Sequence, residues 1–266
     1  AQMSRPAISI RNEGSWTFGS PSVLMMFHRE PGLLSTELAE IDECMPYYYK
    51  VTNGHGQGAE LVMDAEAAFM QGRLADAQIL LERAHTGISE SRQENMALCC
   101  DFLARRLSLL IDMEERYALA QKRKELMTQH DMMWINIFNS TCAYYYALLG
   151  RTEQIPALFG EHILSSVNFL APCRPMMEMI ENQVYLAQGA YAKVIGRSEG
   201  LLGMCDRHHY ALVALHIHIQ TAAAYEMLGK RQEAWVLLDQ TIRDAIPDGI
   251  LMPFVENYRY LKQLLV

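Results

Sequence analysis

The stretch at residues 65–84, AEAAFMQGRLADAQILLERA, decides the fold of this chain. Apolar residues recur at helical spacing before Gly72 and again after it. Glycine suits a turn between helices because a helix commonly ends in a residue with positive φ, which costs a residue with a Cβ about 1 kcal/mol. Ala77 is small enough to let the second helix approach the first closely. The stretch therefore predicts two helices joined by a tight turn.

The turn glycine returns along the whole chain. Six positions follow one another at intervals of 38 to 40 residues, namely Gly32, Gly72, Asp112, Gly150, Gly189 and Gly229. Apolar residues at helical spacing flank these turns, and we expect a second helix after Gly150 that carries Ile155, Leu158, Phe159 and Ile163. A period of this size is typical of stacked helical hairpins, which usually serve as recognition surfaces.

Two kinds of motif carry a family resemblance. The units 65–84 and 221–239 (TAAAYEMLGKRQEAWVLLD) place a small residue, an aromatic residue, the turn glycine and an alanine in the order of tetratricopeptide repeats, with longer helices. The stretches EGSWTFGSPSVLMMF (13–27) and MPYYYKVTNGHGQGAELVMDAEA (45–67) resemble the helical-repeat region of large ATP-dependent transcriptional activators of the LuxR class, which include the maltose-regulon activator. The resemblance implies a sensor flanked by a nucleotide-binding switch and a helix-turn-helix that binds DNA.

The expected fold is all-α: a right-handed superhelical solenoid of about six tetratricopeptide-like helix pairs plus a terminal helix. In this single domain, residues 1–17 form an irregular lead-in and residues 18–248 form six pairs of about 39 to 40 residues. Residues 250–266 form the first helix of an incomplete seventh pair, starting at Pro253 and ending in an apolar edge. Because the sequence has neither a G-x-x-x-x-G-K-[ST] loop nor a basic helix-turn-helix, we expect it to be a sensor region excised from a longer protein. The apolar edge is expected to be covered either by further chain or by a second copy.

Composition restricts the partners. The formal net charge is −8, with no basic block, so direct contact with nucleic acid is not expected. The six cysteines have no CxxC spacing and suggest small buried hydrophobic residues in the cytoplasm. No apolar run is long enough to span a membrane, and no signal peptide is evident.

The candidate ligand site lies on the first helix of each pair, which lines the concave face in tetratricopeptide folds. Residues at equivalent distances from successive turns form a polar ladder with apolar neighbours; the candidates are Glu66, Phe69, Phe102, Arg106, Ser140, Tyr144, Met179 and Gln183. A solvated groove with incidental ion pairs explains the ladder about as well. Tyr144 is expected to meet the ligand and Tyr146 to lie in the core, and the three tryptophans, Trp235 among them, are expected to anchor neighbouring pairs.

The remaining sequence patterns indicate neither a metal site nor a catalytic site. The histidines at 208, 209, 216 and 218 lack ligand spacing such as H-E-x-x-H, so neither a metal nor a cofactor is expected. No nucleophile elbow, Ser-His-Asp order or paired-carboxylate site stands out, and the chain is not expected to be an enzyme.

The leading hypothesis is therefore the effector-binding sensor region of a bacterial transcriptional activator, whose partners are a small-molecule or peptide effector and other domains of the parent regulator or a second copy. The alternative is a stand-alone tetratricopeptide adaptor or peptide sensor that mediates protein–protein interaction. A metal found in the purified protein would instead favour an all-helical enzyme.

Overall fold

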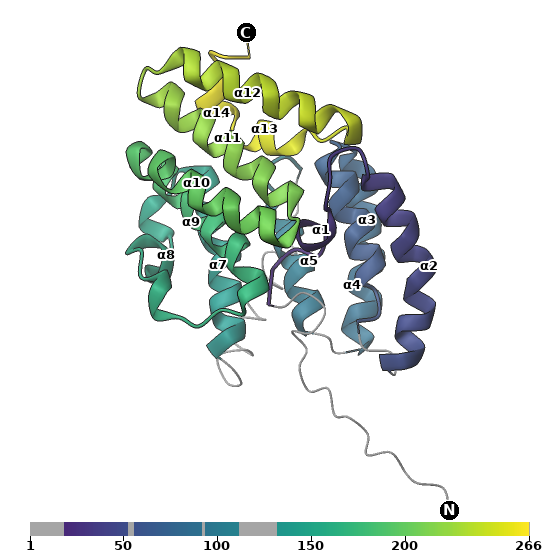
Figure 1. Cartoon of the computed structure of the whole chain (residues 1–266). Coiled ribbons are helices and arrows are strands. Elements are labelled where there is room, and N and C mark those ends of the chain that lie inside the picture. Colours follow the sequence, from purple (N-terminus) through teal and green to yellow (C-terminus); the bar gives the residue numbers. More distant parts are fainter. Residues whose placement is uncertain (1–18, 53–55, 92–93, 112–131, 266) are drawn as a thin grey trace, which may run out of the picture.

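The computed structural model describes residues 19–52, 56–91, 94–111 and 132–265, and across these ranges the chain forms helices and no strands (Figure 1). The all-α prediction is confirmed for this part of the chain. The helices are α1 (Leu24–Phe27), α2 (Leu34–Thr52), α3 (Ala59–Met70), α4 (Leu74–Ser91), α5 (Glu94–Leu107), α7 (Met132–Leu149), α8 (Ala157–Gly160), α9 (Arg174–Ala187), α10 (Tyr191–His208), α11 (Ala211–Met227), α12 (Arg231–Ala245), α13 (Met252–Glu256) and α14 (Tyr258–Leu261).

The α3–α4 hairpin forms as its sequence predicts. Gly72 adopts a φ of +75°, and the amide of Arg73 donates to the carbonyl of Ala68, so the end of α3 is closed by a bond that reaches back over the turn. Ala77 is fully buried, as expected for the residue that lets α4 approach α3.

Two later hairpins repeat this turn. Gly189 joins α9 to α10 with a φ of +75°, and Gly229 joins α11 to α12 with a φ of +74°. The residue after each glycine donates its amide to the carbonyl five residues earlier, as Arg73 does. These turns confirm the helical hairpins predicted at Gly189 and Gly229.

The helix expected after Gly150 is replaced by short turns. Gly150 does end α7 with a φ of +71°, but the next helical segments are a 3₁₀ turn at Thr152–Gln154 and the four-residue α8. Pro156 explains the break, because a proline disfavours the helical conformation of the residue before it, and Ile155 is extended (ψ 128°). His162 then turns the chain again with a φ of 58°.

The predicted unit at Gly32 is not a regular helix pair, and the turn of the unit at Asp112 lies outside the described residues. Gly32 has the expected positive φ of 88°, yet α1 before it has four residues, whereas α2 after it has 19. Asp112 and the 1–17 lead-in, with Trp16, lie outside the described ranges, and the side chain of Trp134 is not described either.

The C-terminal region does not form the single helix expected for a seventh pair. A 3₁₀ turn (Ile246–Asp248), α13 and α14 follow one another, and the last two are separated at Asn257. The side chain of Asn257 donates to the carbonyl of Pro253 at 3.0 Å, which holds the bend between the two helices. We call residues 246–261 the terminal segment.

The first and last parts of the described chain lie in contact. The amide of Ala211 at the start of α11 donates to the carbonyl of His28 at 3.1 Å, and the amides of Gly32 and Leu34 donate to the carboxylate of Asp248 at 2.6 and 3.0 Å. Figure 1 shows α1 beside α11, and the terminal segment between α11 and α3. The interior between the hairpins is therefore filled by the chain itself.

The structure also bears on two expectations from composition, which concern membrane-spanning helices and the burial of the cysteines. None of the described helices is both long and apolar enough to cross a bilayer. All six cysteines are free thiols, and five are buried as expected, whereas Cys44 is exposed on α2.

Candidate functional site

The eight predicted ligand residues do not line an open groove. They come from α3, α5, α7 and α9, as expected, but every one of them is at most 1 % exposed. The prediction placed them on a concave surface because equivalent positions of successive hairpins face the same way. The terminal segment, α1 and α11 cover that surface, so the predicted ladder is the interior of the protein.

Arg106 is the centre of this interior. Its Nε and Nη2 donate to the two carboxylate oxygens of Glu256 on α13 at 2.7 and 2.8 Å, and the Tyr144 hydroxyl donates to Glu256 Oε2 at 3.1 Å. The two charged side chains are 1 % and 2 % exposed. Two parallel bonds from one guanidinium are the arrangement in which arginine recognises a carboxylate most specifically.

Aromatic rings enclose the guanidinium. Its carbon Cζ lies 4.7 Å from the ring centroid of Phe69, 5.4 Å from that of Phe102 and 5.7 Å from that of Tyr144. Burial alone would lower the pKa of Arg106, but the adjacent carboxylate of Glu256 raises it. Burial and the same carboxylate also raise the pKa of Tyr144, so the arginine is charged and the phenol neutral at physiological pH.

The tyrosine assignment was wrong in one respect. Tyr144 is the fully buried member of its run, whereas Tyr146, which was expected in the core, is only half-buried. His216 also faces this centre, with Nδ1 3.4 Å from the Tyr144 hydroxyl. Burial lowers the pKa of His216 well below its ordinary value, so it adds no positive charge next to Arg106.

A second polar contact joins the ladder to the terminal segment. Gln183 donates its amide to the side-chain oxygen of Asn257 at 3.0 Å and accepts a bond from Gln220 at 3.0 Å. Gln220 also donates to the carbonyl of Met179 at 3.1 Å. A row of amides therefore connects α9 and α11 to the bend between α13 and α14.

The other candidates have separate roles. Glu66 accepts a bond from the amide of Leu24 at 2.6 Å, and burial raises its pKa to about 7. Ser140 donates to the carbonyl of Ile137 in its own helix, and the Met179 side chain packs in the core. The structure thus brings together Phe69, Phe102, Arg106 and Tyr144, links Gln183 to the same segment, and gives Ser140 and Met179 packing roles.

The sequence interpretation missed the residues of the terminal segment. Glu256 and Asn257 are two polar residues within an apolar stretch, which is a signal that they face other polar groups. In the structure, the turn glycines Gly72 and Gly150 lie against residues of the terminal segment. A Cβ on Gly72 would lie 3.2 Å from Leu251, and one on Gly150 would lie 2.6 Å from the guanidinium of Arg259.

A small pocket opens beside the Arg106–Glu256 pair. It has a volume of about 280 Å³, and its lining includes Arg106, Leu110, Glu256 and Arg259. A second pocket of about 420 Å³ shares Val255 and Tyr258 with the first and is otherwise apolar. A ligand in either pocket would touch the terminal segment directly.

The site contains no evident metal centre. Within the described ranges, no three or more His, Cys, Asp and Glu side chains are grouped in a way that could hold a metal ion. Comparison with known proteins gives no assignment either: no family model matches the chain, and no curated protein matches it. The resemblance to the LuxR-class activators thus stays a prediction from the sequence.

Proposed function

We propose that this chain is the effector-binding sensor region of a bacterial cytoplasmic transcriptional activator, built as a tetratricopeptide-like solenoid and acting by binding rather than by catalysis. The helical hairpins and their turn glycines support the repeat architecture. The observation that carries the sensor function is the bidentate contact of Arg106 with Glu256, which ties the terminal segment to the interior beside a pocket.

The effector would act on the contact between the terminal segment and the hairpins. A ligand shifts a conformational equilibrium only through unequal affinity for its two states. A molecule bound beside Arg106 and Arg259 contacts both partners of the buried ion pair, so its affinity depends on whether the segment is docked. Arg106 is already paired with Glu256, so Arg259 is the arginine of the lining that favours an effector with an anionic group.

A thermal-shift screen tests this proposal. The purified protein is heated with sugars, amino acids, aromatic acids and short peptides, and a compound at about 100 times its Kd is expected to stabilise it by about 2.7 kcal/mol. Tyr144→Phe removes only one hydroxyl and should weaken the response to that compound, because Tyr144 orients Glu256. Tyr47→Phe, at a position on α2 that is 72 % exposed and lines neither pocket, is the matched control.

The outcomes separate the candidate functions. A response that Tyr144→Phe reduces and Tyr47→Phe preserves supports the sensor. A response to peptides alone, equal in both variants, favours the adaptor and removes the proposed site.

A further inference from the structure

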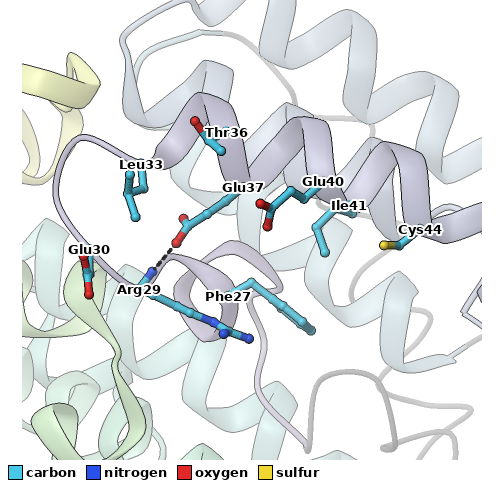
Figure 2. A pocket seen from close by; sticks show the side chains of 9 residues that line it. All are labelled: Phe27, Arg29, Glu30, Leu33, Thr36, Glu37, Glu40, Ile41 and Cys44. Atoms are coloured by element: carbon cyan, nitrogen blue, oxygen red, sulfur yellow. Dashed lines mark hydrogen bonds between the residues drawn. The ribbon is translucent and has the colours of Figure 1, made fainter.

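Three neighbouring hollows share no lining residue with the two pockets at the terminal segment. The first, of about 360 Å³, lies between α1 and the first turns of α2 (Figure 2). The second, of about 380 Å³, shares Arg29 and Glu30 with it and continues past the end of α10. The third, of about 760 Å³, shares Leu202 and His218 with the second and runs between α10 and α12 over α11. Neighbouring hollows share residues, and we call the three together the acidic groove.

The acidic groove is strongly negative. Six carboxylates line it, those of Glu30, Glu37, Glu40, Asp206, Glu233 and Asp239. Among the described residues that line it, Arg29 is the only arginine or lysine. Glu37 pairs with His28 and Asp239 with Arg243, which leaves four carboxylates at exposed positions. Burial lowers the pKa of His218, so that this side chain is neutral at pH 7.

Apolar side chains lie along the same groove. Trp235 is 50 % exposed and Val236 is 55 % exposed, although the tryptophan was expected to be an anchor between helix pairs. At the other end, Figure 2 shows Phe27 and Ile41 at the same hollow as Glu37 and Glu40. An apolar floor with a charged rim is typical of protein interaction sites, and exposed tryptophan is enriched in their energetic centres.

We infer that the acidic groove docks a basic amphipathic helix of a partner protein. Apolar residues on one face of that helix would cover Trp235 and Val236, and Lys or Arg on its other face would meet Glu30, Glu40 and Asp206. Charge selects this occupant. Nucleic acid is repelled by the carboxylates, and a second copy of a chain with a net charge of −8 brings further negative charge to the groove.

The docking helix can be tested with a synthetic peptide that carries leucine on one helical face and lysine on the other. Binding is followed by the intrinsic fluorescence of Trp235, with Trp235→Phe identifying the signal that comes from this residue. We expect the affinity to fall at least about tenfold between low salt and about 0.5 M salt, because exposed charges are screened. The matched peptide has glutamate in place of lysine and should not bind.

Paired substitutions locate the peptide on the protein. Glu30→Gln with Glu40→Gln should weaken binding about fivefold, since each exposed ion pair contributes little alone. Glu153→Gln with Glu161→Gln removes two exposed carboxylates next to α8, outside the groove, and should leave the affinity unchanged.

Four results would overturn the inference: no binding up to about 1 mM peptide, affinity independent of salt, equal losses in the two double variants, or equal binding of the glutamate peptide. Self-association that Trp235→Ala abolishes, without peptide binding, would assign the groove to a second copy and would also refute the inference. None of these measurements depends on an effector at Arg106, so the two proposals can fail separately.

Discussion

The Glu256→Gln substitution probes the contact on which the sensor proposal depends. The introduced glutamine side chain would have nearly the same shape, but it could accept only one of the two bonds from Arg106 and would leave a positive charge buried without its counter-charge. Breaking a buried ion pair by removing one partner costs about 3 to 5 kcal/mol. In a domain of this length, the lower value corresponds to a fall in Tm of about 6 to 12 °C.

The measurement is urea unfolding followed by far-ultraviolet circular dichroism, with Asp76→Asn as control. Asp76 pairs with Arg73 at 2.7 Å, but both side chains are more than half exposed, so that substitution should cost less than about 1 kcal/mol. A third variant, Arg106→Met with Glu256→Met, replaces both charges by apolar groups. It should recover much of the stability, because no unpaired charge is left in the interior.

Trypsin cleavage reports on the terminal segment itself. Arg259 lies in α14, three residues after Glu256, and cleavage after it requires the segment to leave its docked position. Glu256→Gln should raise the rate of cleavage after Arg259 by a larger factor than the rate of cleavage at other sites in the chain. If Glu256→Gln instead matches Asp76→Asn in both stability and cleavage, Arg106 does not hold the terminal segment, and the reasoning behind the sensor proposal is refuted.

Three further predictions address the surroundings of this contact. The folded-state pKa of Glu66 is raised by burial from 4.5 to about 7, so the folded state binds more protons than the unfolded state between these values, and stability should fall by about 3 kcal/mol as pH rises from 4.5 to 7. Glu66→Gln should flatten that dependence in urea titrations at several pH values, and an unchanged slope would reject the assignment. Gly72→Ala should cost more than Gly229→Ala in Tm, because both glycines have positive φ but only the first has Leu251 within 3.2 Å of the new Cβ; equal losses would show that Leu251 is not fixed there. Asp248→Asn should cost about 1 to 2 kcal/mol in denaturant unfolding, since an amide cannot accept both backbone bonds at the start of α2, and a neutral result would contradict those bonds.

The hairpins could be predicted from the sequence because their determinants are local. Gly72, Gly189 and Gly229 combine a residue that tolerates positive φ with helical apolar spacing on both sides, and each of these signals lies within about 20 residues of the turn. The prediction failed after Gly150, where the apolar spacing is also helical but Pro156 prevents a continuous helix.

The site could be predicted only in part. Counting from the turns correctly selected Arg106 and Tyr144 as members of one cluster, because equivalent positions of neighbouring hairpins face one another. The count could not show that the cluster is covered, since its carboxylate partner, Glu256, lies 150 residues from Arg106 in the sequence. The exposure of Trp235 was missed for the same reason: spacing gives the face of a helix, and tertiary packing decides whether another helix covers it.

The terminal segment keeps its helical order only while it is docked against the hairpins. Helices of five and four residues have no independent stability, because helix nucleation is unfavourable and few bonds follow it. Their order therefore depends on docking, through Glu256 to α5 and α7 and through Asn257 to α9. A molecule bound beside Arg106 and Glu256 adds a contact that exists only while the segment is docked, and so favours the docked state. Binding at one arginine would thereby be transmitted to all the hairpins that the segment joins, including the first, which Asp248 holds through the start of α2.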